Sequence, residues 1–255
     1  MLNNSCLSCM GTGWILESNE GRGVAKRCEC YKKFRRMALF EQANIPKRYK
    51  NCTLKNFESE HHDSLRHALK ISKKLVANYP AQDIGLLFQG PCGVGKTHLA
   101  VAIIHELITE KGIPCYFCDF RDLIRNIQKT YDFESPLSES DVLQPIFQKK
   151  VLVLDELGAK RTSAWVEETV FYIINQRYNN MKLTIFTSNY IDSGEEEEDT
   201  RASSFKKSEF NKQGDDTLVD RIGVRLRSRI YEMCKIVNMG EKDYRKVLKQ
   251  GSYRF

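Results

Sequence analysis

The stretch Gly90-Pro91-Cys92-Gly93-Val94-Gly95-Lys96-Thr97 decides the fold of this chain. It matches the phosphate-binding pattern G-x-x-x-x-G-K-[ST]. The apolar run at residues 84–88 predicts a buried strand before it, and apolar residues at helical spacing over 97–110 predict a helix after it. A strand, a glycine loop and a helix start direct several backbone N–H groups at one anion. The stretch therefore predicts a site for the phosphates of ATP.

The parts of this loop have separate expected roles. Lys96 is expected to reach the β- and γ-phosphates, and the Thr97 hydroxyl is expected to hold Mg²⁺. Gly93 and Gly95 let the backbone approach phosphate oxygens closely. The residues expected to contact the nucleotide are Gly90, Pro91, Cys92, Gly93, Val94, Gly95, Lys96, Thr97 and His98.

Strands and helices alternate along most of the chain. Apolar runs predict strands at 84–88, 114–118, 151–154, 183–187 and 235–239. Helical patterns are found at 62–79, 97–110, 121–131, 142–147, 165–179, 217–233 and 241–248, and a polar loop is expected over 192–214. This alternation predicts an α/β fold with a five-stranded parallel sheet between helices.

Polar residues at two predicted strand ends complete a candidate catalytic site. Asp155 and Glu156 follow the third predicted strand. Asp155 is expected to organise Mg²⁺ beside the phosphate loop, and Glu156 to accept a proton from the attacking water. Asn189, after the fourth predicted strand, is the candidate for orienting this water or sensing the γ-phosphate, with Thr187 as the second candidate.

A cluster of cysteines precedes this domain. Cys6, Cys9, Cys28 and Cys30 form a C-x-x-C and a C-x-C pair, joined by a glycine-rich stretch with strand-like pieces. The segment resembles a zinc ribbon, because four thiolates suit tetrahedral Zn²⁺ and so short a segment has little apolar core. The C-x-C pair is tighter than the usual C-x-x-C, so free structural thiols are the alternative.

The composition limits the class of protein. The 255 residues are 41% apolar and 29% charged, which is typical of a globular protein. No apolar run approaches the ~20 residues of a membrane helix, and residues 1–5 lack the features of a signal peptide. We therefore expect a cytoplasmic protein without membrane association, whose nine cysteines are not a disulfide framework. Residues 1–45 are expected to form the cysteine module with a basic helix, and residues 46–255 the nucleotide domain.

The net charge of +7 is concentrated in two regions. Residues 21–50 hold ten Lys/Arg against two acids, and residues 219–255 hold ten against four. Such surfaces suit a polyanionic partner, although a solvated surface is the alternative. The predicted basic helix at 31–43, with Phe34 and Met37 on its apolar side, could bind a protein, bind nucleic acid or act as a connector.

The motifs together have a specific resemblance. The phosphate loop, Asp155-Glu156-Leu157-Gly158, Thr187-Ser188-Asn189, the arginine-rich stretch 220–229 and Gly240-Glu241-Lys242-Asp243-Tyr244-Arg245 resemble the AAA+ ATPases of the DnaC/DnaI helicase-loader group, over about residues 45–245. The IstB transposition ATPases belong to the same clade. The cysteine-bearing segment is also similar to the zinc-binding domain with which some loaders grip the helicase.

The resemblance implies roles for further residues. Arg229 matches the arginine finger that acts on the γ-phosphate in a neighbouring subunit, with Arg225 and Arg227 as alternatives, and Arg245 matches the second nucleotide sensor. Self-association in the ATP-bound state follows from a finger supplied by another subunit.

The same resemblance implies a DNA-binding element. In this clade a helical element after the second strand holds single-stranded DNA. Here Arg121, Arg125 and Lys129 recur on one helix face, and Phe120 or Tyr131 could stack on bases. A plain solvated face is the alternative.

The function expected from this set is ATP-dependent loading of a hexameric, ring-shaped replicative helicase onto single-stranded DNA at the initiation of replication. The nearest alternative is an IstB-like transposition ATPase that binds duplex DNA, but such proteins usually lack the cysteine module. An ATP-binding adaptor with little turnover is disfavoured by Glu156 and the candidate finger arginines. A small-molecule kinase is less favoured still, because the Asp-Glu pair suits water activation.

Overall fold

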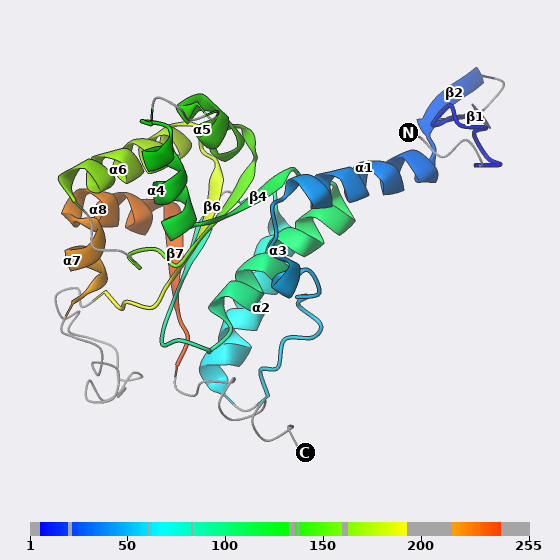
Figure 1. The fold of residues 1–255 in the computed structure, drawn as a ribbon. Coiled ribbons are helices and arrows are strands. Elements are labelled where there is room, and N and C mark those ends of the chain that lie inside the picture. Colours follow the sequence, from blue (N-terminus) through cyan, green and yellow to red (C-terminus); the bar gives the residue numbers. More distant parts are fainter. Residues whose placement is uncertain are drawn as a thin grey trace, which may run out of the picture.

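The computed structural model describes residues 6–19, 22–60, 62–82, 84–132, 136, 138–159, 163–192 and 216–240. Over this part of the chain, a helix-covered sheet forms the body, and a long helix projects from it to a small hairpin (Figure 1). None of the described helices is both long and apolar enough to cross a membrane.

The central sheet has five parallel strands in the order β4-β5-β6-β3-β7. This confirms the predicted α/β fold. The strands are β3 (Gly85–Gln89), β4 (Cys115–Asp119), β5 (Val151–Asp155), β6 (Leu183–Ser188) and β7 (Cys234–Asn238). β3, β5 and β6 are buried along their whole length, as expected for a sheet covered on both faces.

Helices cover the two faces of the sheet separately. Alternate residues of β3 show the division: Leu86 and Phe88 lie in one core cluster, and Leu87 lies in the other. The first cluster packs under α2 (Asp63–Asn78) and α3 (Lys96–Lys111). The second packs under α4 (Phe120–Lys129), α5 (Glu139–Gln148), α6 (Ala164–Asn179), α7 (Leu218–Ile222) and α8 (Val224–Met233).

An arm carries the cysteine segment away from the body (Figure 1). The antiparallel hairpin of β1 (Trp14–Asn19) and β2 (Arg22–Arg27) leads into α1 (Glu29–Gln42). The far end of α1 packs on the body, where the rings of Phe40 and His105 meet at 5.2 Å.

The segment after α1 protects the edge strand β4. The backbone N–H of Phe117 donates to the Ala43 carbonyl (2.8 Å), and Asn44 Nδ2 donates to the Phe117 carbonyl (3.1 Å). These bonds pair backbone groups that an edge strand would otherwise leave open. The short helix η1 (Lys47–Tyr49) follows.

Two sequence expectations are corrected. α5 begins at Glu139 rather than at 142, because Ser138 and Asp141 form a capping box. The helix expected over 217–233 is two helices, since Gly223 between them has a φ of 81°. Phe34 and Met37, on the predicted apolar side of the basic helix, are exposed. The expected helix at 241–248 and nearly all of the polar loop lie outside the described residues.

Candidate nucleotide site and cysteine cluster

The phosphate loop joins β3 to α3 in the predicted way. Gly95 precedes the first residue of α3 and has a φ of 95°. A Cβ there would lie 2.7 Å from the Phe57 ring, and a Cβ on Gly90 would lie 1.8 Å from the Met239 carbonyl oxygen. Lys96 is buried, and its Nζ donates to the carbonyls of Gly90 and Pro91, both at 2.7 Å. The loop therefore folds back around the ammonium group.

A hydroxyl–carboxylate network links the loop to two strand ends. Thr97 Oγ1 donates to Asp155 Oδ1 (2.9 Å), and Thr187 Oγ1 donates to the same oxygen (2.6 Å). The Thr187 hydroxyl also accepts from the backbone N–H of Glu156 (2.9 Å). The structure thus brings together Thr97 and Asp155, the predicted magnesium ligands. Thr187, the second sensor candidate, lies at the centre of the network.

The environment of Asp155 suits a cation. Burial raises the pKa of its carboxyl to about 6, while the hydrogen bonds from Thr187 and Thr97 oppose this rise. A divalent cation beside the carboxylate would favour its charged form. Hydroxyl and carboxylate oxygens are also the ligands that Mg²⁺ prefers, so this pair fits a magnesium ion.

Glu156 follows β5 in a left-handed backbone conformation, with a φ of 57°. Its carboxylate forms an ion pair with the guanidinium of Arg121, in the first turn of α4. Arg121 Nη2 also lies 3.7 Å from Asp119 Oδ2. The arginine that was expected to face DNA therefore contacts the predicted general base. Nothing in the sequence pattern signalled this pairing.

A groove leads from solvent to these acids. Its volume is about 960 Å³, and it runs along β4 between the segment after α1 and helices α4 and α5. Its lining includes Asp119, Arg121, Asp155 and Glu156. The candidate catalytic carboxylates are therefore reachable from the β4 edge of the sheet.

The finger candidates lie on the other side of the sheet from α3. Arg229 Nη1 is 3.7 Å from Glu232 Oε2, and its guanidinium lies 4.4 Å from the Tyr178 ring centroid. Arg225 pairs with Glu168 at 3.2 Å, and Arg227 pairs with Asp192. The structure does not bring Arg229 to the phosphate loop of its own chain.

Two other predicted nucleotide contacts remain predictions. Asn189 directly follows β6, but the hydrogen bonds at this strand end come from its neighbours. Thr187 bonds to Asp155, and Ser188 Oγ donates to the Leu157 carbonyl (3.0 Å). Arg245 lies outside the described residues.

His98 contacts residues 53–56, for which no helix or strand was predicted from the sequence. Its Nε2 is 3.1 Å from the Thr53 carbonyl oxygen and 3.1 Å from Asn56 Oδ1. Thr53 and Asn56 cap each other, since each backbone N–H donates to the other's side chain. The Phe57 ring then lies against Gly95 and His98. In the sequence, the Thr-x-x-Asn spacing of Thr53 and Asn56 was the available signal for this capped turn.

An aromatic pair adjoins the basic face of α4. Tyr131 is 60% exposed, and its ring meets Trp165, at the start of α6, edge to face at 5.7 Å. Arg125 and Lys129 are exposed on the same helix. The expected stacking role of Phe120 is wrong, because this side chain is completely buried under α4. Trp165 was not predicted as part of this surface, because it is distant in sequence from the basic face.

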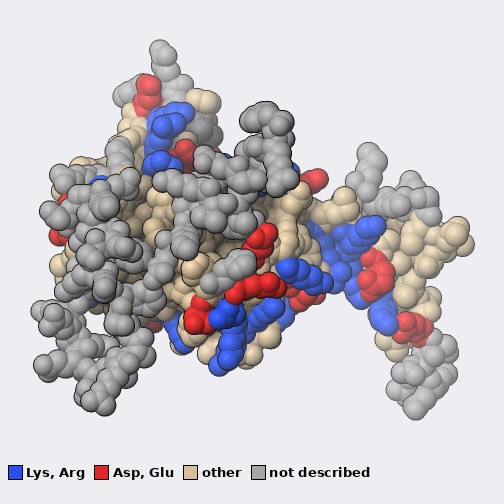
Figure 2. Space-filling view, turned by 90° about the horizontal axis from the view of Figure 1, so that it is seen from below, with Lys and Arg blue, Asp and Glu red and all other residues tan. Residues whose placement is uncertain are grey.

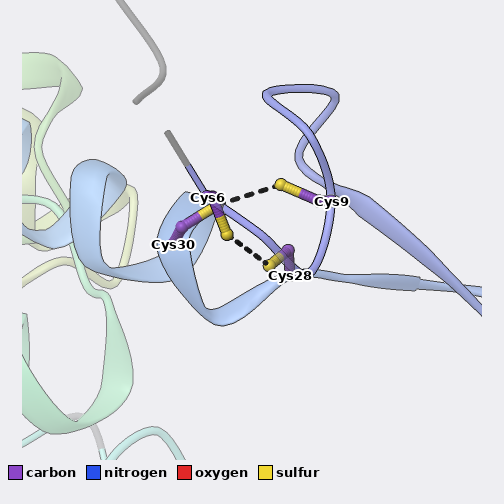
Figure 3. A group of neighbouring side chains, drawn as sticks. All are labelled: Cys6, Cys9, Cys28 and Cys30. Carbon is purple, nitrogen blue, oxygen red and sulfur yellow. Dashed lines mark hydrogen bonds between the residues drawn. The ribbon is translucent and has the colours of Figure 1, made fainter. Parts of the chain in front are cut away.

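The four cysteines gather into one cluster where the hairpin meets α1. Their sulfur atoms all lie within 4.8 Å of one another and point toward a common centre (Figure 3). Sγ separations are 3.7 Å for Cys6 and Cys28 and 3.3 Å for Cys9 and Cys30. Zn–S bonds of about 2.3 Å in a tetrahedron place sulfurs ~3.8 Å apart, so the cluster fits zinc.

Beside this cluster, the Arg27 side chain joins the hairpin to α1. The Arg27 guanidinium lies 3.6 Å from the Trp14 ring centroid and 4.1 Å from that of Tyr31. Trp14 is in the hairpin and Tyr31 in α1, so this stack joins the two elements. Cys28 immediately precedes α1 and Cys30 lies within it. A bound metal would therefore be tied to the first turn of the helix.

The sequence of this chain is similar to those of known ATP-binding proteins and helicase loaders. The family described as IstB-like ATP binding protein matches residues 26–252. The replicative helicase loader DnaC of Buchnera aphidicola subsp. Acyrthosiphon pisum is 29% identical over 148 residues, which are 58% of this chain and 59% of that protein. DnaC of Escherichia coli K12 is 25% identical over 150 residues, 59% of this chain and 60% of that protein.

The chain thus spans about three fifths of the length of these curated relatives. Among solved structures, a crystal structure of the DnaC helicase loader is 36% identical with a TM-score of 0.61. That match covers 76% of this chain and 100% of the DnaC chain.

Proposed function

The chain belongs to the family of IstB-like ATP-binding proteins, within its DnaC/DnaI-type AAA+ ATPases, and on this premise we propose that it is an ATP-dependent loader of a ring-shaped replicative helicase onto single-stranded DNA. One observation carries the ATPase part of the proposal. Thr97, Asp155 and Thr187 form one hydrogen-bonded network beside Glu156 and the phosphate loop. The proposed magnesium ligands and the proposed general base therefore lie together where β5 and β6 end beside the phosphate loop.

Hydrolysis would use these groups as follows. The loop amides and Lys96 bind the β- and γ-phosphates, and Thr97 and Asp155 would hold magnesium, which neutralises phosphate charge when bound. Glu156 accepts a proton from the water whose oxygen attacks the γ-phosphorus, while the bond to the bridging oxygen breaks and ADP leaves. Because Arg121 pairs with Glu156, this base acts only after that ion pair opens.

A second copy of the chain would complete the site. α8 packs against α6 on the face of the sheet opposite α3, and this position supports Arg229 acting on a phosphate bound by a neighbour. Arg225 and Arg227 have closer acidic partners than Arg229, which favours Arg229 as the finger. The groove along β4 offers this neighbour a path to Asp155 and Glu156. ATP binding would therefore favour self-association.

Single-stranded DNA would bind beside α4. Arg125 and Lys129 provide cations for the phosphate backbone, and the exposed Tyr131 with Trp165 provides a surface for unpaired bases. Aromatic and basic groups in one place are the combination that single-stranded nucleic acid requires. This supports single-stranded DNA as the track onto which a helicase is loaded.

The arm is the proposed contact with the helicase. Lys and Arg side chains gather along it at the right of the molecule (Figure 2). On α1 the apolar side chains of Phe34 (41% exposed) and Met37 (57% exposed) lie among Lys33 and Arg35, which are also exposed. Apolar anchors within a charged surround are typical of a protein interface. A partner with an acidic, apolar surface would fit.

The test is a loading experiment with the full chain and the purified replicative helicase of the same organism. The expected result is that the helicase is transferred to closed circular single-stranded DNA only with this chain and ATP, and that Lys96→Ala abolishes the transfer. A second variant, which combines Phe34→Ala and Met37→Ala, tests the arm. It should keep ATP hydrolysis and lose helicase binding. Helicase transfer that does not depend on the chain would contradict the proposal.

A further inference from the structure

The outer face of α2 carries an unbroken row of positive charge. Arg66, Lys70, Lys73 and Lys74, here called the α2 cationic stripe, are all exposed. At about 100° per residue these four positions lie within a ~100° arc, and they span about 12 Å along the axis. Residues 64–78 contain no Asp or Glu. The stripe therefore presents one sign of charge along most of the helix.

The packing of α2 turns this stripe outward. Ala68, Leu75 and Val76 are buried on the opposite side of the helix, in the core shared with α3. Because those residues fix the rotation of α2, the stripe faces solvent and not the body.

Few neighbouring groups neutralise the stripe. Arg66 pairs with Asp63 and donates to the Glu60 carbonyl. Among the described residues, Lys70, Lys73 and Lys74 form no ion pair.

Further cations flank the stripe. Lys111 of α3 donates to the carbonyls of Ala77 and Tyr79 at the end of α2. Lys235 is exposed on β7, on the same side of the strand as Val237, which packs in the α2–α3 core. The local field is therefore positive beyond the helix itself.

The side chains of the α2 cationic stripe indicate which class of partner it binds. No exposed large apolar side chain lies on α2, whereas such side chains are found on the arm and beside α4. Protein interfaces need an apolar centre, and membrane-surface helices need an apolar face. A surface of charge alone suits a phosphate backbone. Without an aromatic side chain for unpaired bases, it suits a duplex, in which the bases are stacked inside.

We propose that the α2 cationic stripe binds the phosphate backbone of duplex DNA without regard to sequence. The proposal rests on the proposed function only in taking DNA as the site of action. α2 and α4 cover opposite faces of the sheet. One chain therefore holds duplex on one side and single strand on the other, the arrangement found at a duplex–single-strand junction.

The test measures binding of the full chain to a labelled random-sequence duplex across a salt series. Lys70→Gln, Lys73→Gln and Lys74→Gln are combined, since glutamine is a good helix former. We expect duplex affinity to fall at least ~10-fold. The slope of log affinity against log salt should become shallower by about 2–3, because each neutralised phosphate contributes about 0.9 to it. The matched control combines Lys47→Gln, Arg48→Gln and Lys50→Gln, which removes the same charge from η1 and its C-cap and should change affinity less than ~3-fold.

Duplex binding that is unchanged in the α2 variant overturns the proposal, and so does an equal loss in the control. Binding of the α2 variant to phosphatidylserine vesicles and to the purified helicase is measured in parallel. A loss there with intact duplex binding also overturns it. Arg125→Gln with Lys129→Gln separates this proposal from the loader function. If that variant loses single-strand binding while the α2 variant keeps duplex binding, the stripe proposal fails and the loader function stands.

Discussion

The sheet body and the cysteine module are held together in opposite ways. The body buries two apolar clusters, one on each face of a five-stranded sheet. In the module, Cys9, Gly13 and Cys28 are the buried residues among those described in 6–30, while Leu16 and Val24 are exposed. The body therefore folds on its own core, whereas we expect the module to depend on a metal ion that links its four cysteines. Changes in the body's site should alter rates, and changes in the module should alter folding.

The largest expected effect is therefore in the module. Cys28→Ser should lower bound zinc from about one ion per chain to none, because the remaining thiolates no longer close a tetrahedral site. Hydrogen exchange over residues 14–27 should then become fast, while the thermal transition of the body is retained. Metal analysis and hydrogen exchange, measured on one sample, check the loss of zinc and the loss of hairpin protection. A metal-free protein with a protected hairpin would refute this dependence on a metal ion.

The second largest effect is expected on ATP hydrolysis by the sheet body. Arg229→Ala should lower kcat for ATP by roughly 10³-fold without changing the melting temperature, since fingers supplied by a neighbour act on the transition state. Arg225→Ala is the control, because Arg225 already pairs with Glu168, and it should change kcat little.

Mixing two inactive variants tests whether the finger comes from the neighbour. Arg229→Ala keeps an intact phosphate loop, and Lys96→Ala keeps an intact finger. One complete site forms where the two chains meet, so the mixture should regain part of the activity. No recovery over the sum of the single variants would argue against a finger in trans.

Glu156→Gln should keep ATP binding and lower hydrolysis by about 10²-fold, the usual loss for a general base. Glutamine preserves shape, so the fold should be unaffected. Nucleotide titration and single-turnover hydrolysis separate the two quantities. Normal turnover would assign the base to another group.

The sequence predicted the contact between Thr97 and Asp155 for a physical reason. Parallel strands of one sheet carry the residues that follow them to the same edge of the sheet, where Asp155 meets the phosphate loop. The order β4-β5-β6-β3-β7 itself was not predictable from a linear pattern. Thr187, rather than Asn189, bonds to Asp155, because the side chain of Thr187 points at that carboxylate from the end of β6. A linear pattern does not determine such side-chain directions.

Other features could be predicted only in part. Gly223 was visible as a helix breaker but stood within an apolar period, so one helix was predicted where the structure has two. The pairing of Arg121 with Glu156 depends on the left-handed backbone at Glu156 and on α4 beginning at Phe120. The start of α4 had a signal in the sequence, since the Asp119 side chain caps it by accepting from the backbone N–H groups of Arg121 and Asp122, but residue type does not signal the backbone conformation of Glu156.

The smallest expected effect concerns this last pair. Both side chains are partly exposed, and such ion pairs are worth at most about 1 kcal/mol, or a ~5-fold change in a population. Arg121→Gln should therefore raise basal ATP hydrolysis up to ~5-fold by freeing Glu156. Arg125→Gln, one turn further along the exposed face of α4, is the matched control and should leave basal hydrolysis unchanged. A rate that falls in Arg121→Gln would mean that the arginine positions Glu156 for the reaction and does not restrain it.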